Sequence, residues 1–302
     1  MIEKTINYAP AVSIGMPVYN GEKYIREALD SLLAQTFENF ELIISDNCST
    51  DGTSHICKEY TSRDSRIRYI RQDTNIGPIA NFEFVLQEAR GEFFMWAACD
   101  DYLENNNYLS VMVNTMQGRY DFCFPSVKLQ LENAVKKTIS DGIMDRFSSC
   151  VSTHDYCKQT ALTCSYQIYG LFKRNFLIVN FKYIAQCKHL RCFGEGLFVH
   201  AITANSLLTY VPAASLVYRR HEGNVSSTQE INHLLVDFYK FTYMLILFYI
   251  QYQNFNCVQK LSIFSKIFLV HGKYFLILLY GFLTQFIINL FKVLNINLSS
   301  FK

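Results

Sequence analysis

The sequence predicts an α/β fold built on a mostly parallel sheet that is flanked by helices on both faces. Three observations support this prediction: short runs of branched apolar residues recur along the first hundred residues, each run is followed by a polar loop, and most loops lead into a stretch of helical periodicity. Strands that alternate with helices pair in parallel, and ligands bind at the carboxyl ends of such strands. The polar loops therefore mark the edge where we expect a site.

Three strand–loop–helix units and a fourth strand account for residues 11–98. The expected strands are residues 11–18, 40–45, 66–70 and 92–98. The expected helices are residues 22–35 and 54–61 and a third helix that ends near residue 90. The fourth strand ends abruptly at Cys99-Asp100-Asp101. Two adjacent carboxylates thus follow an apolar strand.

The pattern is less regular between residues 120 and 220. Expected elements are a strand at 120–131, helices at 153–163 and 196–206, and a strand at 208–218. We expect these elements to complete the sheet.

Past residue 230 the sequence becomes strongly apolar, in two runs at residues 238–250 and 274–291. A helix that spans a bilayer needs about 20 apolar residues. The second run is marginal, because Thr284 interrupts it and Lys273 and Lys292 flank it. We expect an apolar helical tail that lies at a membrane interface. The alternative is a pair of buried helices packed on the first domain or on a second subunit.

Composition excludes several classes of protein. The net charge is +2 and no stripe of Lys and Arg is present, so a nucleic acid is not an expected partner. No apolar leader precedes the first strand, so we expect a cytoplasmic location. The cysteines form neither a C-x-x-C pair nor a zinc spacing, and in a reducing compartment we expect most of them to be buried. They lie at 48, 57, 99, 123, 150, 157, 164, 187, 192 and 257.

The loops carry the candidate site residues. Adjacent carboxylates such as Asp100 and Asp101 are costly to leave unpaired, and their hard oxygens suit Mg or Mn bound to a diphosphate; capping of a helix is the alternative. Asp46 follows a buried strand, whereas Asp51 stands in a good helix N-cap sequence and is expected to be structural. Glu195 precedes an apolar helix, where it could act as a base or simply complement the helix dipole.

The segments VSIGMPVYNGEKYIREALDSLLAQTFENFELIISDNCSTDGT and TNIGPIANFEFVLQEARGEFFMWAACDDYL resemble the family-2 inverting glycosyltransferases of the GT-A fold, among them bacterial surface-polysaccharide enzymes. The resemblance implies a nucleotide-sugar donor, usually a uridine diphosphate sugar, a Mg or Mn ion, and single displacement at the anomeric carbon. It implies a catalytic domain at 1–228, with a donor half at 1–118 and an acceptor half at 119–228. The apolar region at 229–302 is not covered by it.

The resemblance also implies roles for particular residues. The positions expected to line the nucleotide-sugar site are Pro17, Tyr19, Glu22, Asp46, Asn81, Asp100 and Arg219. Those expected to bind metal are Asp100, Asp101 and His221, and the expected base is Glu195, ahead of His154, Asp155 and Asp145. Packing or capping remains the alternative for Tyr19 and Asn81, and Arg220 is an alternative to Arg219 as the clamp on the diphosphate.

Three departures from the family pattern accompany these expectations. Asn47 and Cys48 replace the common Asp and Gly, Ala98 stands at the first position of the family's Asp-x-Asp motif, and Gly196 follows Glu195 where an Asp is frequent. We expect transfer of a sugar to a lipid-linked or growing surface glycan at the inner face of the membrane. The sequence is compatible with an oligomeric enzyme. A polyprenyl-phosphate sugar transferase and a non-catalytic scaffold subunit of a glycan-assembly complex are the alternatives.

Overall fold

The structure is a computed structural model. It describes residues 9–132, 137–140, 144–160, 166–186, 194–221 and 242–267, together with 269 and 272. The second apolar run at 274–291 lies outside these residues, as do Cys164, Cys187 and Cys192.

The first half of the sheet is parallel, as expected. Its strands are β1 (Val12–Val18), β2 (Phe40–Asp46), β3 (Ile67–Arg71) and β4 (Phe93–Trp96). Both β2 and β4 pair with β1 in parallel, and β3 extends the sheet beyond β2. β1, β2 and β4 are largely apolar runs buried on both faces, which is why they could be found from sequence alone, whereas β3 is an edge strand with one buried residue.

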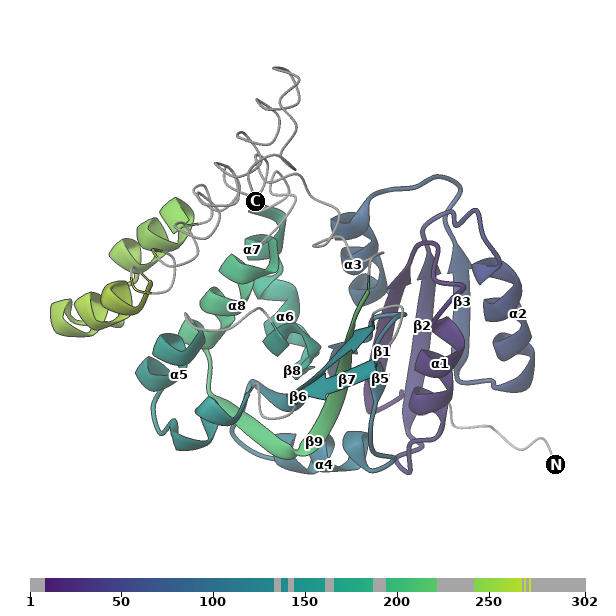
Figure 1. Ribbon diagram of the computed structural model, residues 1–302, viewed down its shortest axis with the longest axis horizontal. Coiled ribbons are helices and arrows are strands. Elements are labelled where there is room, and N and C mark those ends of the chain that lie inside the picture. Colours follow the sequence, from purple (N-terminus) through teal and green to yellow (C-terminus); the bar gives the residue numbers. More distant parts are fainter. Residues whose placement is uncertain are drawn as a thin grey trace, which may run out of the picture.

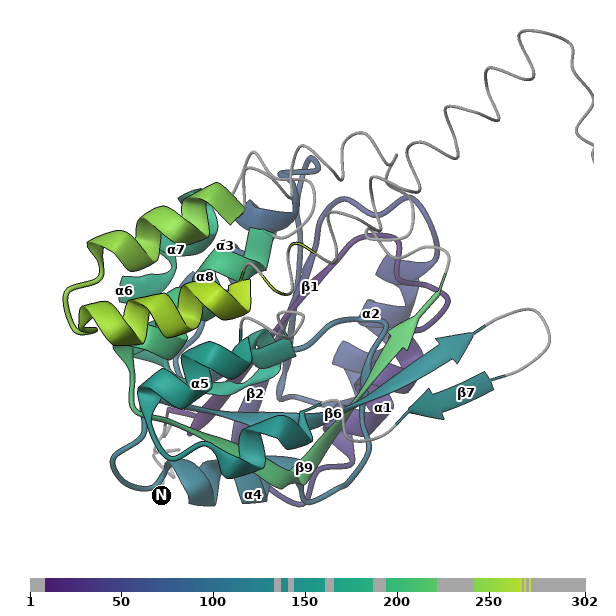
Figure 2. The ribbon, with the colours of Figure 1, turned by 60° about the vertical axis from the view of Figure 1, so that its left-hand side comes forward.

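The second half corrects the expectation of a mostly parallel sheet, because the whole sheet is mixed. The other strands are β5 (Tyr102–Leu103), β6 (Phe122–Glu132), β7 (Lys137–Ser140), β8 (Leu171–Lys173) and β9 (Leu208–Arg220). The order is β3-β2-β1-β4-β8-β6-β9-β5, with β7 paired to β6. β8 runs antiparallel to both β4 and β6, and β5 runs antiparallel to β9. The β6–β7 ribbon projects from the body (Figure 2).

Helices flank the sheet on both faces (Figure 1). They are α1 (Ile25–Leu33), α2 (Thr53–Arg63), α3 (Pro78–Gln87), α4 (Tyr108–Met116), α5 (Thr153–Thr160), α6 (Arg174–Asn180), α7 (Lys182–Gln186) and α8 (Gly194–Asn205), with 3₁₀ turns at Asp145–Ser149 and Tyr166–Tyr169. The chain moves outward from β1 to β3 and then returns through α3 to β4 on the other side of β1. The strand order thus reverses between β1 and β4, where open α/β sheets bind ligands.

The core is rich in aromatic side chains. Trp96, the only tryptophan of the chain, is 1% exposed and its indole N–H donates to the carbonyl of Phe82. Its ring contacts those of Phe94, Phe172, Phe181 and Phe198. These contacts join β4, β8, α6 and α8, so one side chain links the two halves of the sheet.

Two C-terminal helices, residues 242–251 and 257–267, form an antiparallel pair that we call the C-terminal hairpin (Figures 1 and 2). Its inner face packs on α5 and α8, and Leu245, Tyr249 and Ile263 are fully buried there. The described part of the first apolar run therefore packs against the body of the fold. Within the described ranges, no helix is long and apolar enough to cross a bilayer.

Cysteine burial matches the expectation only in part. Cys57, Cys123 and Cys157 are buried, but Cys257 is exposed and the remaining described cysteines are partly exposed. Burial raises the pKa of Cys57, Cys123 and Cys157 to about 12 in each case, so these thiols are inert packing groups.

Candidate functional site

The candidate site lies at the carboxyl ends of β1, β2 and β4, where the strand order reverses. The loop after β1 carries Tyr19, the loop after β2 carries Cys48, and the loop after β4 carries Asp100. β9 runs past this edge and ends with His221 beside Asp100. Residues more than a hundred positions apart are thus brought to one edge.

The loop after β1 presents an exposed aromatic ring on an anchored backbone. Pro17 is partly exposed within β1 opposite Ser45 of β2, and the Tyr19 ring is 49% exposed. Glu22 accepts a hydrogen bond from the backbone N–H of Gly52, and its own N–H donates to Asp51. Asp51 also accepts from Thr53 at the start of α2. Asp51 is structural, as predicted. Glu22 also stabilises the contact between the loop after β1 and the start of α2.

Asp46 is fully buried at the end of β2 and makes three strong contacts. It accepts hydrogen bonds from the Ser49 N–H, the Tyr69 hydroxyl and the Arg71 guanidinium, at 2.7–2.9 Å. Burial opposes its ionisation, but hydrogen bonds from Ser49, Tyr69 and Arg71 outweigh it and hold the pKa of Asp46 below its ordinary value. An ionised carboxylate therefore stands behind the second loop, with Tyr69 and Arg71 as neighbours that sequence reasoning missed.

The third loop is held by amide side chains. Asn47 donates to the Asn75 side chain at 2.9 Å and accepts from the Ile76 N–H at 2.8 Å. The side chain of Asn81 is 2% exposed, and it accepts from the Ser45 hydroxyl and donates to the Ser45 carbonyl. This placement favours the packing alternative for Asn81, because its amide ties α3 to β2. Asn47, noted only as a departure from the family, fixes the loop.

Asp100 and His221 form the part of the site that fits a divalent metal. The imidazole Nε2 of His221 lies 3.1 Å from Asp100 Oδ2, and the two side chains are 14% and 25% exposed. One carboxylate and one imidazole, completed by diphosphate oxygens and water, suit Mg or Mn, which seldom takes all its ligands from protein. Among the described residues, no three His, Cys, Asp or Glu side chains cluster as a ready-made metal site.

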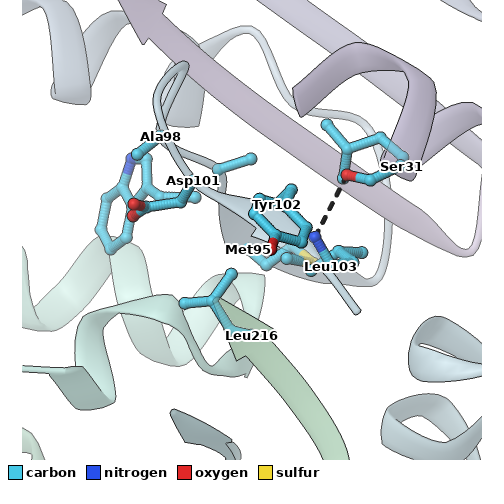
Figure 3. A pocket seen from close by; sticks show the side chains of 10 residues that line it. Ser31, Met95, Ala98, Asp101, Tyr102, Leu103 and Leu216 are labelled. Carbon is cyan, nitrogen blue, oxygen red and sulfur yellow. Dashed lines mark hydrogen bonds between the residues drawn. The ribbon is translucent and has the colours of Figure 1, made fainter. Parts of the chain in front are cut away.

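Asp101 does not fit the metal role expected for it. The side chain is 3% exposed and its Oδ1 accepts the backbone N–H of Arg219 at 2.8 Å. Burial, with repulsion from Asp100, raises the pKa of Asp101 well above its ordinary value. It lines a small internal cavity of about 10 Å³ together with Ala98 and Leu216 (Figure 3). Asp101 thus stabilises the loop after β4 by its hydrogen bond to the backbone of β9.

Arg219 also lies inside the protein, where it cannot clamp a diphosphate in this conformation. It is 1% exposed, forms an ion pair with Glu27, and donates to the carbonyl of Asp100 at 2.7 Å. Its guanidinium lies over the rings of Tyr24 and Tyr102, at 4.6 and 5.3 Å from their centroids. Arg219 therefore positions the Asp100 loop, while Arg220 is exposed on the other side of the strand.

Tyr24, Glu27 and Tyr102 are the functional neighbours that sequence reasoning missed at this point. Tyr24 also stacks beside His221, with ring centroids 4.5 Å apart. The first turn of α1 and the short strand β5 thereby enclose the end of β9. The sequence around Arg219 gives no sign of this arrangement, because Tyr24 and Tyr102 come from distant parts of the chain.

The opposite wall carries Glu195 and a group of tyrosines. Glu195 lies exposed in the first turn of α8. Burial raises the pKa of Tyr169 well above its ordinary value, and the charges of Asp101, Asp100 and Glu195 add to the increase. The ring centroids of Tyr169 and Tyr218 lie 6.4 Å apart.

The three weaker base candidates are engaged elsewhere. His154 contacts the carbonyl of Gln259 in the C-terminal hairpin, and Asp145 accepts from the Tyr210 hydroxyl at 3.1 Å. Asp155 accepts from Ser152 at the start of α5. Two of these contacts join distant parts of the chain and the third caps α5, so Glu195 is the candidate that we retain.

Comparison with known proteins identifies the sequence relatives. The family model described as glycosyl transferase family 2 matches residues 13–178. An uncharacterized glycosyltransferase of Haemophilus influenzae is 34% identical over 122 residues, which are 38% of this chain and 48% of that protein. The putative glycosyltransferase EpsH of Bacillus subtilis is 35% identical over 133 residues, 44% of this chain and 38% of that protein. The matches thus span about half or less of these relatives.

Solved structures share the fold. The S. aureus TarS 1–349 structure with UDP-GlcNAc superposes with a TM-score of 0.69 and 22% identity, and the match covers 87% of this chain and 73% of that one. The mannosyltransferase PcManGT of Pyrobaculum calidifontis, in complex with GDP-Man and Mn²⁺, gives a TM-score of 0.55 and 15% identity over 87% of this chain and 70% of that one. At these identities the likeness concerns the fold.

Proposed function

Because the chain belongs to glycosyl transferase family 2, we propose that it transfers a sugar from a nucleotide sugar to an acceptor with inversion at the anomeric carbon. The observation that carries the proposal is the Asp100–His221 pair at the strand-reversal edge, 3.1 Å apart and partly exposed. The donor is a uridine diphosphate sugar in this proposal. UDP-GlcNAc is bound by a protein of the same fold, and Asp46 supplies an ionised carboxylate behind the second loop.

Asp100 and His221 would hold Mg or Mn against the diphosphate of the donor. The metal would neutralise the charge that develops on the departing nucleoside diphosphate. Arg219 and Asp101 act behind the loop, where they fix the direction of the Asp100 carboxylate. Tyr19 offers an exposed ring on which the base can lie.

Glu195 is the proposed general base. Its carboxylate is exposed at the start of α8, and it can accept the proton of the acceptor hydroxyl as that oxygen attacks the anomeric carbon. The sugar carbon gains the acceptor oxygen as its bond to the diphosphate oxygen breaks, so configuration inverts. Tyr169 and Tyr218 would form the wall against which the acceptor sugar rests.

The acceptor in this proposal is a lipid-linked or growing surface glycan, reached at the inner face of the cell membrane. The apolar C-terminal region supports a location beside a membrane-bound acceptor. In the proposed transfer, the nucleoside diphosphate of the donor is the leaving group.

Turnover by the purified full-length chain tests the proposal. We expect release of uridine diphosphate from one UDP-sugar of a panel, dependent on Mn or Mg, and faster with a lipid-linked glycan fraction. Glu195→Gln should lower turnover by about a hundredfold or more, the usual contribution of a positioned base. Turnover that survives this change would favour a polyprenyl-phosphate acceptor, which is already ionised. No turnover with any donor would favour the scaffold alternative, for which Ala98 is the motivating residue.

A further inference from the structure

The outward side of the C-terminal hairpin is apolar, although it is not covered by any described residue. Tyr243, Leu247 and Ile250 recur at spacings of four and three on the first helix and are 36–56% exposed. On the second helix Val258 and Leu261 are 75% and 63% exposed. The residues that face the body are a separate set, with Leu245 and Tyr249 fully buried. A surface helix ordinarily turns a polar face outward.

The charged side chains of the C-terminal part of the sequence are all of one sign. Residues 238–302 contain no Asp or Glu, whereas they contain six lysines, at 240, 260, 266, 273, 292 and 302. All 26 acidic residues of the chain therefore precede residue 238. Lys260 and Lys266 belong to the second helix of the hairpin itself. Helices that combine an exposed apolar face with lysines and carry no acidic residue have the pattern of helices that lie in the interface of an anionic bilayer.

We propose that the outward face of the C-terminal hairpin, formed by Tyr243, Leu247, Ile250, Val258 and Leu261, docks on an anionic lipid surface. This inference builds on the proposed function, for which it supplies the surface that meets the membrane. A second copy of this chain is the less favoured partner, because the lysines of the two hairpins, Lys260 and Lys266 in each copy, would repel each other across the interface. The apolar side chains enter the headgroup boundary and the lysines pair with lipid phosphates.

Docking would hold the acceptor side of the enzyme at a fixed distance from the bilayer surface. The inner face of the hairpin packs on α8 through Leu197 and Ala204, and α8 begins at Gly194 next to the proposed base. A helix of this length spans about 18 Å. The hairpin is therefore rigidly connected to Glu195 through one helix, which suits an acceptor that is itself anchored in the bilayer.

Vesicle binding by the full-length chain tests the assignment. Flotation with phosphatidylcholine vesicles is compared with flotation with vesicles that also contain phosphatidylglycerol. We expect binding to the anionic vesicles that weakens with added salt, and at least about tenfold weaker binding by Val258→Glu/Leu261→Glu, because two charges would enter the interface. The matched control Val151→Glu/Val179→Glu, at exposed apolar positions outside the hairpin, should bind like wild type.

Three results would overturn the assignment. Unchanged binding by Val258→Glu/Leu261→Glu would place the lipid contact elsewhere in the chain. Equal binding to neutral vesicles would remove the role of the lysines. The third result combines two measurements: wild type does not bind vesicles, and light scattering gives a dimer mass that falls to the monomer mass in Val258→Glu/Leu261→Glu. It would make the face an interface between two copies of the chain. Uridine diphosphate binding, measured on the same samples by thermal shift, shows separately whether the proposed function fails.

Discussion

Replacing Arg219 by methionine should loosen the Asp100 loop, because this buried guanidinium connects that loop with α1 and β5. The change removes a charged hydrogen bond of 2.7 Å to the Asp100 carbonyl, worth about 1.5–3 kcal/mol. It also removes stacking on Tyr24 and Tyr102, worth about 2 kcal/mol in a desolvated place. Methionine restores part of the packing, and half-exposed Glu27 regains water. We therefore expect a loss of about 3 kcal/mol of unfolding free energy.

A melting curve followed by fluorescence of Trp96, the only tryptophan, measures this loss. About 3 kcal/mol corresponds to a fall in Tm of roughly 5 °C for a chain of 302 residues. Arg220→Met is the matched control, since its side chain is exposed next to Arg219, and it should change Tm by less than about 1 °C. Arg219→Met should also weaken metal-dependent nucleotide binding. If Arg219→Met and Arg220→Met have the same Tm and the same affinity for the nucleotide, the positioning role of Arg219 is refuted.

Other predictions follow from single sites. Asp46→Asn should lower stability by about 2 kcal/mol at pH 7 by weakening the contacts of a buried carboxylate. Because its folded pKa lies below 3.8, that stabilisation is complete above pH 3.8 and is lost as the pH falls through the folded pKa, so the Tm difference from wild type should shrink in acid; a constant difference would contradict the assignment. Gly15→Ala would bring a Cβ within 2.7 Å of two core side chains and should cost about 1–3 kcal/mol, whereas Gly272→Ala meets no neighbour and should melt like wild type. Asn47→Ala should free the third loop and raise the Kd for uridine diphosphate about fivefold with little change in Tm; an unchanged Kd would show that the loop is held without it.

The first half of the sheet could be predicted from sequence because its signals are local. Strands β1, β2 and β4 are largely apolar runs, Asp46 is the last residue of β2, and Asp100 lies in the loop that follows β4. The short strand β8 could not be found in this way. It has three residues, and it is buried because β4 and β6 pair with it from either side, which only the assembled sheet determines.

The structure brings Asp100 and His221 to 3.1 Å although 121 positions separate them, and their metal role stays a prediction. Arg219 shows what sequence could not reveal. A late arginine beside a histidine suggests a solvent-facing contact with phosphate, but Tyr24 and Tyr102, carried by α1 and β5, enclose its guanidinium. Burial of a charged side chain depends on such long-range partners and leaves no pattern near the residue itself.

The first apolar run of the C-terminal region shows a second limit. Its composition alone fits a membrane helix or a core helix equally, because both are strongly apolar. In the structure one side of residues 242–251 packs on α8, as the buried-helix alternative expects, and the other side is exposed, where membrane contact stays a prediction.

Metal-dependent binding of uridine diphosphate by wild type and by Asp100→Ala tests the central claim most directly. A calorimetric titration with and without Mn²⁺ should show affinity for the nucleotide that needs the metal in wild type and is lost in Asp100→Ala, with the Tm of the apoprotein nearly unchanged because Asp100 is partly exposed. Equal, metal-independent binding by both proteins, or no binding by either, would contradict the assignment of this edge of the sheet as a nucleotide-sugar site.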